Sequence, residues 1–164
     1  MKTIVVELGP DGIKRAIQEI QAYKNEVQQK TKDLLKLMVA YGEDYAINAV
    51  THIDTGETLG SIKGYRTGNK GVIVAGGNAI WLEFGTGIKN NGSAGSSPHP
   101  KGSELGMVIG GYVAGHGANP KGWWYEDNGE IKHTYGIRAT QFMWKTALEL
   151  HKVAPDLARE VFSR

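Results

Sequence analysis

A long, uninterrupted helical pattern near the start of the chain is the feature that most constrains its fold. Apolar residues recur from Ile13 to Ala49 at steps of three, four or seven, with Lys, Glu and Gln in the intervals and no proline. At about 1.5 Å per residue such a helix would extend about 60 Å, more than a domain of this size needs to cover its core. We expect the surplus to be solvated, kinked at Gly42 or packed on another subunit, and we favour a subunit contact by the N-terminal half. The stripe comprises Ile13, Ile17, Ile20, Val27, Leu34, Met38, Tyr41, Tyr45 and Ala49.

A short β-branched run precedes this helix. Residues 3–8 read as a strand, closed by the turn residues 9–12, and Asp11 is the predicted N-cap of the helix. The strand is too short to stand alone. We therefore expect it to pair with a strand from elsewhere in this chain or from a neighbouring copy.

After the helix, residues 54–62 predict a turn that leads into a hairpin. Asp54 is suited to an Asx turn, and Gly56 gives the backbone freedom beside Thr55. Strands are predicted at 61–66 and 71–76, with a Gly-Asn tip between them. A Gly-Asn pair at 77–78 then turns the chain into residues 79–87.

Residues 79–87 hold one carboxylate among large apolar side chains and end in a Gly-Thr-Gly turn. We expect Glu83 either at a polar edge or buried with a partner such as Arg66 or Arg138, because a buried carboxylate without a partner would cost several kcal/mol. A structural anchor that fixes the turn is favoured over catalysis. The neighbouring residues are Trp81, Leu82, Phe84, Gly85, Thr86 and Gly87.

The second half of the chain contains an insertion, a hairpin and a helix. Gly, Ser, Asn and Pro dominate residues 88–122, which we interpret as a flexible insertion that orders against a partner, with His99 solvated. Residues 123–126 and 130–135 predict a second hairpin with an Asn-Gly tip. A helix is predicted at 138–153, broken or restarted at Pro155, with a last turn or two at 156–162. The predicted fold is a single α+β domain, residues 1–164, with the two helices packed on a small, mostly antiparallel β-sheet.

Composition excludes several classes of protein. The chain has no cysteine, which excludes disulfides and thiolate metal sites, and a net charge of +2, too small to predict nucleic-acid binding. No apolar run approaches the roughly 20 residues of a membrane span. The N-terminus does not resemble a signal peptide, so we expect a protein that is cytosolic when made.

The search for chemistry favours a protein without catalytic or cofactor sites. His52, Asp54 and Ser61 lie close in sequence but straddle a helix end and a strand start, without the Gly-x-Ser-x-Gly elbow of a hydrolase. No two histidines have the four-residue helical spacing of a metal site. The glycine-rich stretches do not match a phosphate-binding loop. The possible metal ligands are His52, Asp54, Glu83, His99, His116 and His133.

Three phrases in a fixed order resemble the tail-component family of long-tailed bacteriophages, the neck or tail-completion proteins. The family pattern is a long N-terminal helix, Asp-Thr-Gly-x-Leu-x-x-Ser-Ile, a hairpin, aromatic-Leu-Glu-Phe-Gly-Thr, a variable loop and a C-terminal helix. The first two phrases match at Asp54–Gly56, Leu59 and 61–62, then at 81–86. The third lies in 136–147 and includes Ile137, Ala139, Phe142, Met143 and Ala147.

This resemblance implies a structural virion protein of the head–tail junction, present in the host cytoplasm during assembly. Family members join heads to tails, so the chain is expected to form a ring, a hexamer to match the tail, between a head-completion or connector protein and a tail terminator or tail tube protein. DNA would at most pass through the lumen, and no membrane, cofactor or enzymatic activity is implied. The interface candidates are Asp54, Thr55, Gly56, Trp81, Glu83, Phe84, Gly85, Thr86 and Phe142.

Two alternatives from other classes stay open. The aromatic run at 122–129 resembles one repeat of a choline- or glucan-binding protein, so a phage-associated cell-wall-binding accessory is the runner-up. Aromatic residues next to Lys or Arg, as in Tyr65-Arg66 and Trp144-Lys145, could stack on nucleic acid, which leaves a DNA-packaging accessory as the third reading.

Overall fold

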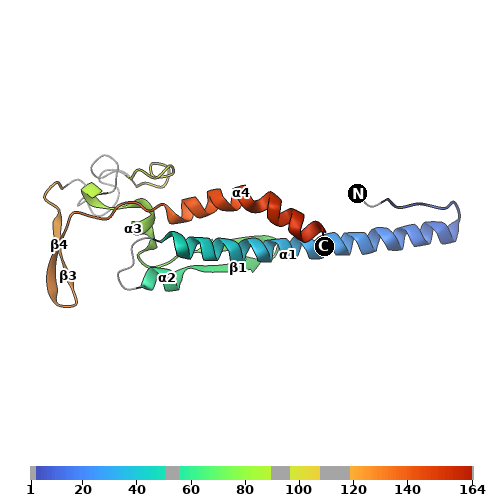
Figure 1. The fold of residues 1–164 in the computed structure, drawn as a ribbon, viewed down its shortest axis with the longest axis horizontal. Helices are drawn as coiled ribbons and strands as arrows, with labels where there is room; N and C mark the ends of the chain where they lie inside the picture. The colour runs from blue at the N-terminus through green and yellow to red at the C-terminus, as the bar shows by residue number, and fades with distance from the viewer. Residues whose placement is uncertain (1–2, 51–55, 90–96, 108–118, 164) are drawn as a thin grey trace.

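Two helices lie side by side along an elongated molecule and define its long axis (Figure 1). The computed structural model describes residues 3–50, 56–89, 97–107 and 119–163. Helix α1 spans Pro10–Ala49 and α4 spans Phe142–Ser163, and both pack with short hairpins and helices in an α+β fold. The predicted fold class is confirmed. The strands form two separate antiparallel pairs, however, in place of one small sheet.

Helix α1 is continuous where a kink was possible. Its N-cap is Gly9, and Asp11 lies inside the first turn, so the prediction of Asp11 as the cap is wrong. An acidic residue there still favours the positive end of the helix dipole. The helix continues through Gly42. A Cβ at this position would lie 2.4 Å from Ile73 Cδ1 and 2.8 Å from Leu150 Cδ1, so the neighbouring side chains pack where a side chain would otherwise be. The glycine therefore permits close packing and does not act as a hinge.

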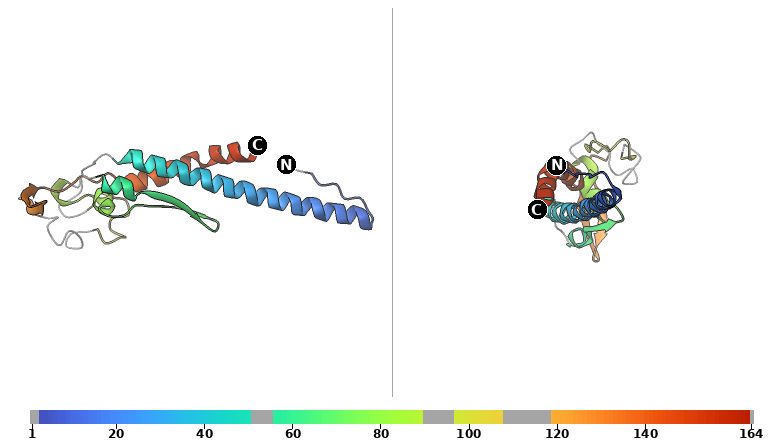
Figure 2. Two further views of the ribbon diagram at one scale, coloured as in Figure 1. Left: turned by 90° about the horizontal axis from the view of Figure 1, so that it is seen from below. Right: turned by 90° about the vertical axis from the view of Figure 1, so that its right-hand side faces the viewer.

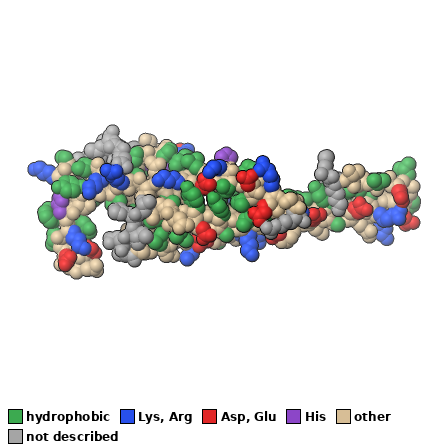
Figure 3. Space-filling view, viewed as in Figure 1, with side chains coloured by type: hydrophobic (Ala, Val, Ile, Leu, Met, Phe, Trp, Pro, Cys, Tyr) green, Lys and Arg blue, Asp and Glu red, His purple; other side chains and the backbone are tan. Residues whose placement is uncertain are grey.

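The first half of α1 extends beyond the rest of the molecule. Lys30 Nζ donates to the carbonyl oxygen of Phe162 at 3.5 Å, which marks where the end of α4 lies along α1. Residues 10–29, which we call the arm, continue past this point in both side views (Figures 1 and 2). Figure 3 shows the arm as a thin extension of a thicker body. The predicted surplus of helix is present, and it is neither kinked nor covered by α4.

Residues 3–8, predicted as a strand, belong to no strand of this chain. They form an extended segment that starts at the free end of the arm and runs back alongside it (Figure 1). The physical reason is that the described strands all lie far from that end, so the segment has nothing to pair with. The prediction of a strand within one chain is wrong.

The first hairpin packs flat on α1. A short helix, α2 (Glu57–Ser61), occupies the position where a strand was predicted to begin, and the strands are β1 (Lys63–Thr67) and β2 (Lys70–Val74). The predicted Gly-Asn tip is confirmed, with Gly68 at φ 57°. Gly64 and Gly71 face the helix, since a Cβ on either would lie 2.6 Å from a Val39 methyl group. These two glycines allow the hairpin to approach α1 closely.

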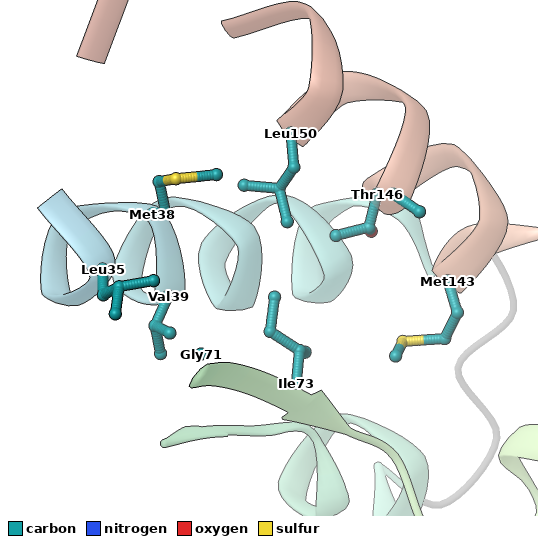
Figure 4. A pocket seen from close by; sticks show the side chains of 9 residues that line it. Leu35, Met38, Val39, Gly71, Ile73, Met143, Thr146 and Leu150 are labelled. Carbon is teal, nitrogen blue, oxygen red and sulfur yellow. The ribbon is translucent and has the colours of Figure 1, made fainter. Parts of the chain in front are cut away.

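The core lies where α1, the first hairpin and α4 meet. Its most enclosed side chains are those of Phe142 and Ile62, and burying each contributes about 1.5–3 kcal/mol. Farther along, Leu35 and Met38 of α1, Ile73 of β2 and Leu150 of α4 face a cavity of about 260 Å³ (Figure 4). The buried core cluster is Ala46, Val50, Ile62, Ala79, Leu82 and Phe142.

The second hairpin is set apart from this core. Strands β3 (Trp123–Asp127) and β4 (Glu130–Thr134) pair with each other, and Figure 1 shows them at the end of the molecule opposite the arm. The predicted Asn-Gly tip is confirmed. Asn128 and Gly129 have φ of 51° and 83°, which is the requirement of a type I′ turn.

Helix α4 differs from its predicted bounds at both ends. It begins at Phe142, not at 138, because Ile137 bonds to Thr86, the Thr140 N–H donates to Leu82 O, and Gln141 has a non-helical φ of 55°. It also continues through Pro155 to Ser163, so the predicted break is wrong. Figure 1 shows the helix bending in its C-terminal part, as expected where a proline removes one helical hydrogen bond.

Candidate functional site

The stretch that contains the single carboxylate forms a short helix between the core and the start of α4. Helix α3 spans Ala79–Phe84, and Leu82, Glu83 and Phe84 are all buried. It ends at Gly85, whose φ of 72° and close approach to the backbone exclude a side chain: a Cβ would lie 2.7 Å from the amide nitrogen of Ala139. A short 3-10 helix, η1 (Gly87–Lys89), follows.

The Gly-Thr-Gly turn is held by a reciprocal backbone pair across 50 residues of chain. The Thr86 N–H donates to Ile137 O at 2.8 Å, and the Ile137 N–H donates to Thr86 O at 3.0 Å. The Thr86 hydroxyl oxygen also accepts from the Ile137 N–H at 3.0 Å. Gly136 has φ 100°, and a Cβ there would lie 1.9 Å from Thr86 O. The second and third family-like motifs, at 81–86 and 136–147, are therefore in direct contact.

Glu83 caps the N-terminus of α4 from a different helix. Its Oε2 accepts from the Met143 N–H at 2.8 Å, and its Oε1 accepts from the Trp144 N–H at 2.9 Å. The first N–H groups of a helix have no partner within it, and a carboxylate there is also favoured by the helix dipole. Gln141, directly before α4, has φ 55°, and no capping bond from its side chain to the first turn exists among the described residues. Glu83 takes that role, so it is a buried structural anchor.

His99 completes this anchor, contrary to the prediction that it is solvated. Its imidazole is only 8% exposed, and Nε2 lies 2.9 Å from Glu83 Oε1. Its Nδ1 accepts from the Lys101 N–H at 2.9 Å, so the ring proton of the neutral imidazole lies on Nε2 and is donated to Glu83. The ring also contacts Phe84 and Trp144, with centroids 4.5 Å and 5.7 Å away.

The predicted arginine partners of Glu83 are not its partners. Arg66 donates to the carbonyl oxygen of Lys32 at 3.3 Å, and no bond from Arg138 to Glu83 exists within the described residues. Two backbone amides and one imidazole replace the arginine. A buried carboxylate needs donors rather than a cation, and these three supply them.

This arrangement is suited to holding segments together and not to bond-making chemistry. The Ser61 hydroxyl donates to Thr58 O at 2.7 Å and accepts from the Gly76 N–H at 3.0 Å, so it links α2 to the end of the first hairpin. His52 and Asp54, its possible relay partners, lie outside the described residues. Within the described ranges no three metal-binding side chains gather, and His133 Nε2 instead lies 2.8 Å from Lys121 O.

Most of the predicted interface residues lie together around Glu83, and the others lie at the start of α2 or outside the described residues. Two phrases come together around Glu83, and Phe142 is fully enclosed in the adjoining core. Gly56 is the N-cap of α2, with φ 75°. Asp54 and Thr55 lie outside the described residues, as do 90–96 and 108–118 of the predicted insertion. The residues that meet at the anchor are Trp81, Glu83, Phe84, Gly85, Thr86 and Phe142, all within α3, its turn or the start of α4.

Among the described residues, two projecting elements, the arm and the second hairpin, carry exposed apolar side chains. On the arm, Ile13, Ile17 and Ile20 are 49%, 61% and 54% exposed; we call these three residues the arm stripe. On the second hairpin, Trp124 and Ile131 are 69% and 67% exposed. Apolar side chains that gather on projecting elements are typical of interaction surfaces.

Comparison with known proteins adds no relative: no family model, no curated protein and no solved structure matches this chain. In the described part of the chain, no helix has the length and apolar character needed to cross a membrane.

Proposed function

We propose that this chain is a structural component of the head–tail junction of a long-tailed bacteriophage, a neck or tail-completion protein that assembles with copies of itself into a ring. In the virion the ring would join the connector or head-completion protein to the tail terminator or tube. Its role is structural, and the contacts between the family-like sequence motifs stabilise the fold of each subunit. The proposal begins from the ordered resemblance of these phrases to the tail-component family.

The single observation that carries the proposal is the uncovered arm stripe. It continues the same face of α1 that α4 covers farther along, where Tyr41 donates to Glu149 Oε1 at 3.3 Å. The cover ends near Lys30, yet the apolar side chains continue for almost five more turns of helix. A helix in a protein gains most of its stability from packing its amphipathic face against other elements. An arm of this kind is therefore expected to pack on another protein, and a ring supplies a neighbour to every copy.

Mixing with the adjacent neck components tests this function. The chain should bind the head-completion protein or the tail terminator of the same phage, and it should be required for heads and tails to join in a mixture of purified parts. Ile17→Lys, which changes only an exposed side chain, should lose this activity, whereas the equally exposed Leu148→Lys on α4 should retain it. Joining that proceeds without the chain would refute the proposal.

A second candidate is supported by the face of the second hairpin. Trp124, His133 and Tyr135 pack edge to face, with ring centroids 4.7 Å and 4.8 Å apart, and Trp124 is 69% exposed, so the hairpin presents an aromatic surface to a partner. This favours the phage-associated cell-wall-binding accessory. Sedimentation with purified cell walls, lost on replacing Trp124 and Tyr135 by alanine, would support that role over the neck.

A further inference from the structure

The extended segment before α1 has the sequence of a strand and no strand beside it. Residues 3–8 are Thr-Ile-Val-Val-Glu-Leu, and β-branched residues favour strands. Val5 is 79% exposed and Leu8 is fully exposed. The Glu7 carboxylate pairs with Arg15, and the Glu7 backbone packs against buried Gly12 of the arm, so the segment rests on the arm at this point. Its backbone is still unpaired with any described strand.

The outer edge of β2 offers the complementary backbone groups. Because Thr67 and Lys70 flank a two-residue loop, they form a hydrogen-bonded pair, and the N–H and C=O groups of Gly71 and Ile73 then point away from β1. No described residue bonds to them there. The opposite edge is already used, since the Gly64 N–H donates to Glu43 of α1 at 2.9 Å.

This edge also lacks the features that protect exposed strands from pairing. Natural proteins place lysine, proline or bulges on free edges. Strand β2 has a lysine only at its first residue, Lys70, and residues 71–75 that follow are Gly-Val-Ile-Val-Ala, with neither charge nor proline. The lengths match as well, because the segment has six residues and β2 has five.

An apolar cleft lies at the end of this edge and can receive side chains from an added strand. It has a volume of about 520 Å³ and is lined by Val74 and Ala75 next to Ile80 and Leu105, which are 42% and 57% exposed. Valine and leucine side chains of the segment fit the chemistry of this lining.

The segment cannot reach this edge in its own chain. Arg66, one residue before the end of β1, contacts Lys32, so the hairpin tip lies about 33 Å along α1 from Pro10 at about 1.5 Å per residue. Six extended residues span at most about 20 Å. Both side views show the segment turning back along the arm from its free end, whereas the hairpin lies along the other half of α1 (Figures 1 and 2).

We propose that residues 3–8 of one copy add as a third strand to the outer edge of β2 in a second copy. The giving and receiving surfaces differ, so each copy can give to one neighbour and receive from another, and such contacts close into rings or continue as filaments. Main-chain hydrogen bonds supply the affinity, and the apolar cleft fixes the register. This contact rests on the proposed ring and names the surface through which neighbours bind.

Disulfide trapping tests the contact, because the chain has no cysteine of its own. A single cysteine is placed at each of positions 4 to 8 in turn, and each variant is mixed with a Val74→Cys variant under mild oxidation. Successive side chains of a strand point to opposite faces. Because a disulfide needs the two Cα atoms within about 7 Å, the yield of the linked dimer should peak at the one position opposite Val74 and fall to the control yield at the positions on either side of it. A Leu148→Cys variant, exposed on α4, serves as the control for random collision.

Measuring the mass of the assemblies in the same samples tests the strand-addition contact and the proposed ring independently. A yield that peaks at one position, in a filament or a dimer, would support strand addition and refute the ring. A ring in which all five positions give the control yield would overturn strand addition alone. A monomer at every concentration, with yields no higher than the control, would overturn both. Circular dichroism of each variant confirms that the fold is kept.

Discussion

Removing the carboxylate of Glu83 should destabilise the whole subunit more than any surface change. The side chain is 9% exposed and accepts from three donors, the N–H groups of Met143 and Trp144 and the imidazole of His99. Each buried donor left without an acceptor costs about 1–3 kcal/mol, and breaking a buried pair that includes a charge costs about 3–5 kcal/mol in total. Because the adjoining cleft can admit water, we expect Glu83→Ala to lower the free energy of unfolding by about 3–4 kcal/mol.

The variant Glu83→Gln keeps the size and shape of the side chain but removes its negative charge, so it measures the contribution of the charge. An amide has one acceptor oxygen, so its NH₂ group must face at least one of the three donors. The expected loss is about 1.5–2.5 kcal/mol, between that of Glu83→Ala and the wild type. Urea unfolding followed by tryptophan fluorescence and circular dichroism measures both. Glu104→Gln, which breaks the exposed pair with Lys101, is the matched control and should change stability by less than about 0.5 kcal/mol.

The result that would refute this reasoning is equality with the control. If both Glu83 variants unfold within about 0.5 kcal/mol of the wild type, the carboxylate does not cap α4 in solution. Amide hydrogen exchange gives an independent reading. Exchange at Met143 and Trp144 should accelerate in Glu83→Ala, while amides in the middle of α1 should change only as far as global stability falls.

Three further changes probe other parts of the molecule. Gly136→Ala places a Cβ 1.9 Å from the Thr86 carbonyl oxygen at a φ of 100°, so it should cost about 2–4 kcal/mol by thermal unfolding; an unchanged melting temperature would contradict the close contact. Ile17→Lys should leave the stability of the isolated subunit within about 0.5 kcal/mol but abolish self-association; retained association would exclude the arm stripe as an interface. Partial burial and the charge of Glu149 raise the pKa of Tyr41 above 10.0, so the folded state keeps a proton that the unfolded chain loses. Stability should fall as pH rises above about 10, less steeply in Tyr41→Phe; equal slopes would contradict the shift.

The sequence predicts those elements whose signals are local. The length of α1 follows from its helical periodicity, and both hairpins follow from their Gly-Asn and Asn-Gly tips, because short-range steric preferences decide them. The features that the sequence predicts wrongly depend on tertiary packing. Helix α4 starts at Phe142 instead of the predicted 138 because the N–H groups of Ile137, Thr140 and Gln141 donate to Thr86, Leu82 and Glu83.

The partners of Glu83 could not be predicted from residue types. Two of them are backbone amides 60 and 61 positions away, and an amide N–H exists at every residue except proline. His99 carried a weak signal, since prolines on both sides restrict its backbone, but its burial depends on contact with Phe84 and Trp144. The strand-like residues 3–8 show the converse case, where a correct local preference finds no partner in its own chain.

The central claim, that this chain assembles as a ring, is tested most directly by measuring mass and shape together. Light scattering and negative-stain imaging should be made on the chain alone and with the neighbouring neck proteins. The account predicts a closed ring with a mass that is a whole multiple of 17.8 kDa, about six times that value if it matches a six-fold tail. A monomer that stays elongated at high concentration and is indifferent to those proteins would contradict it.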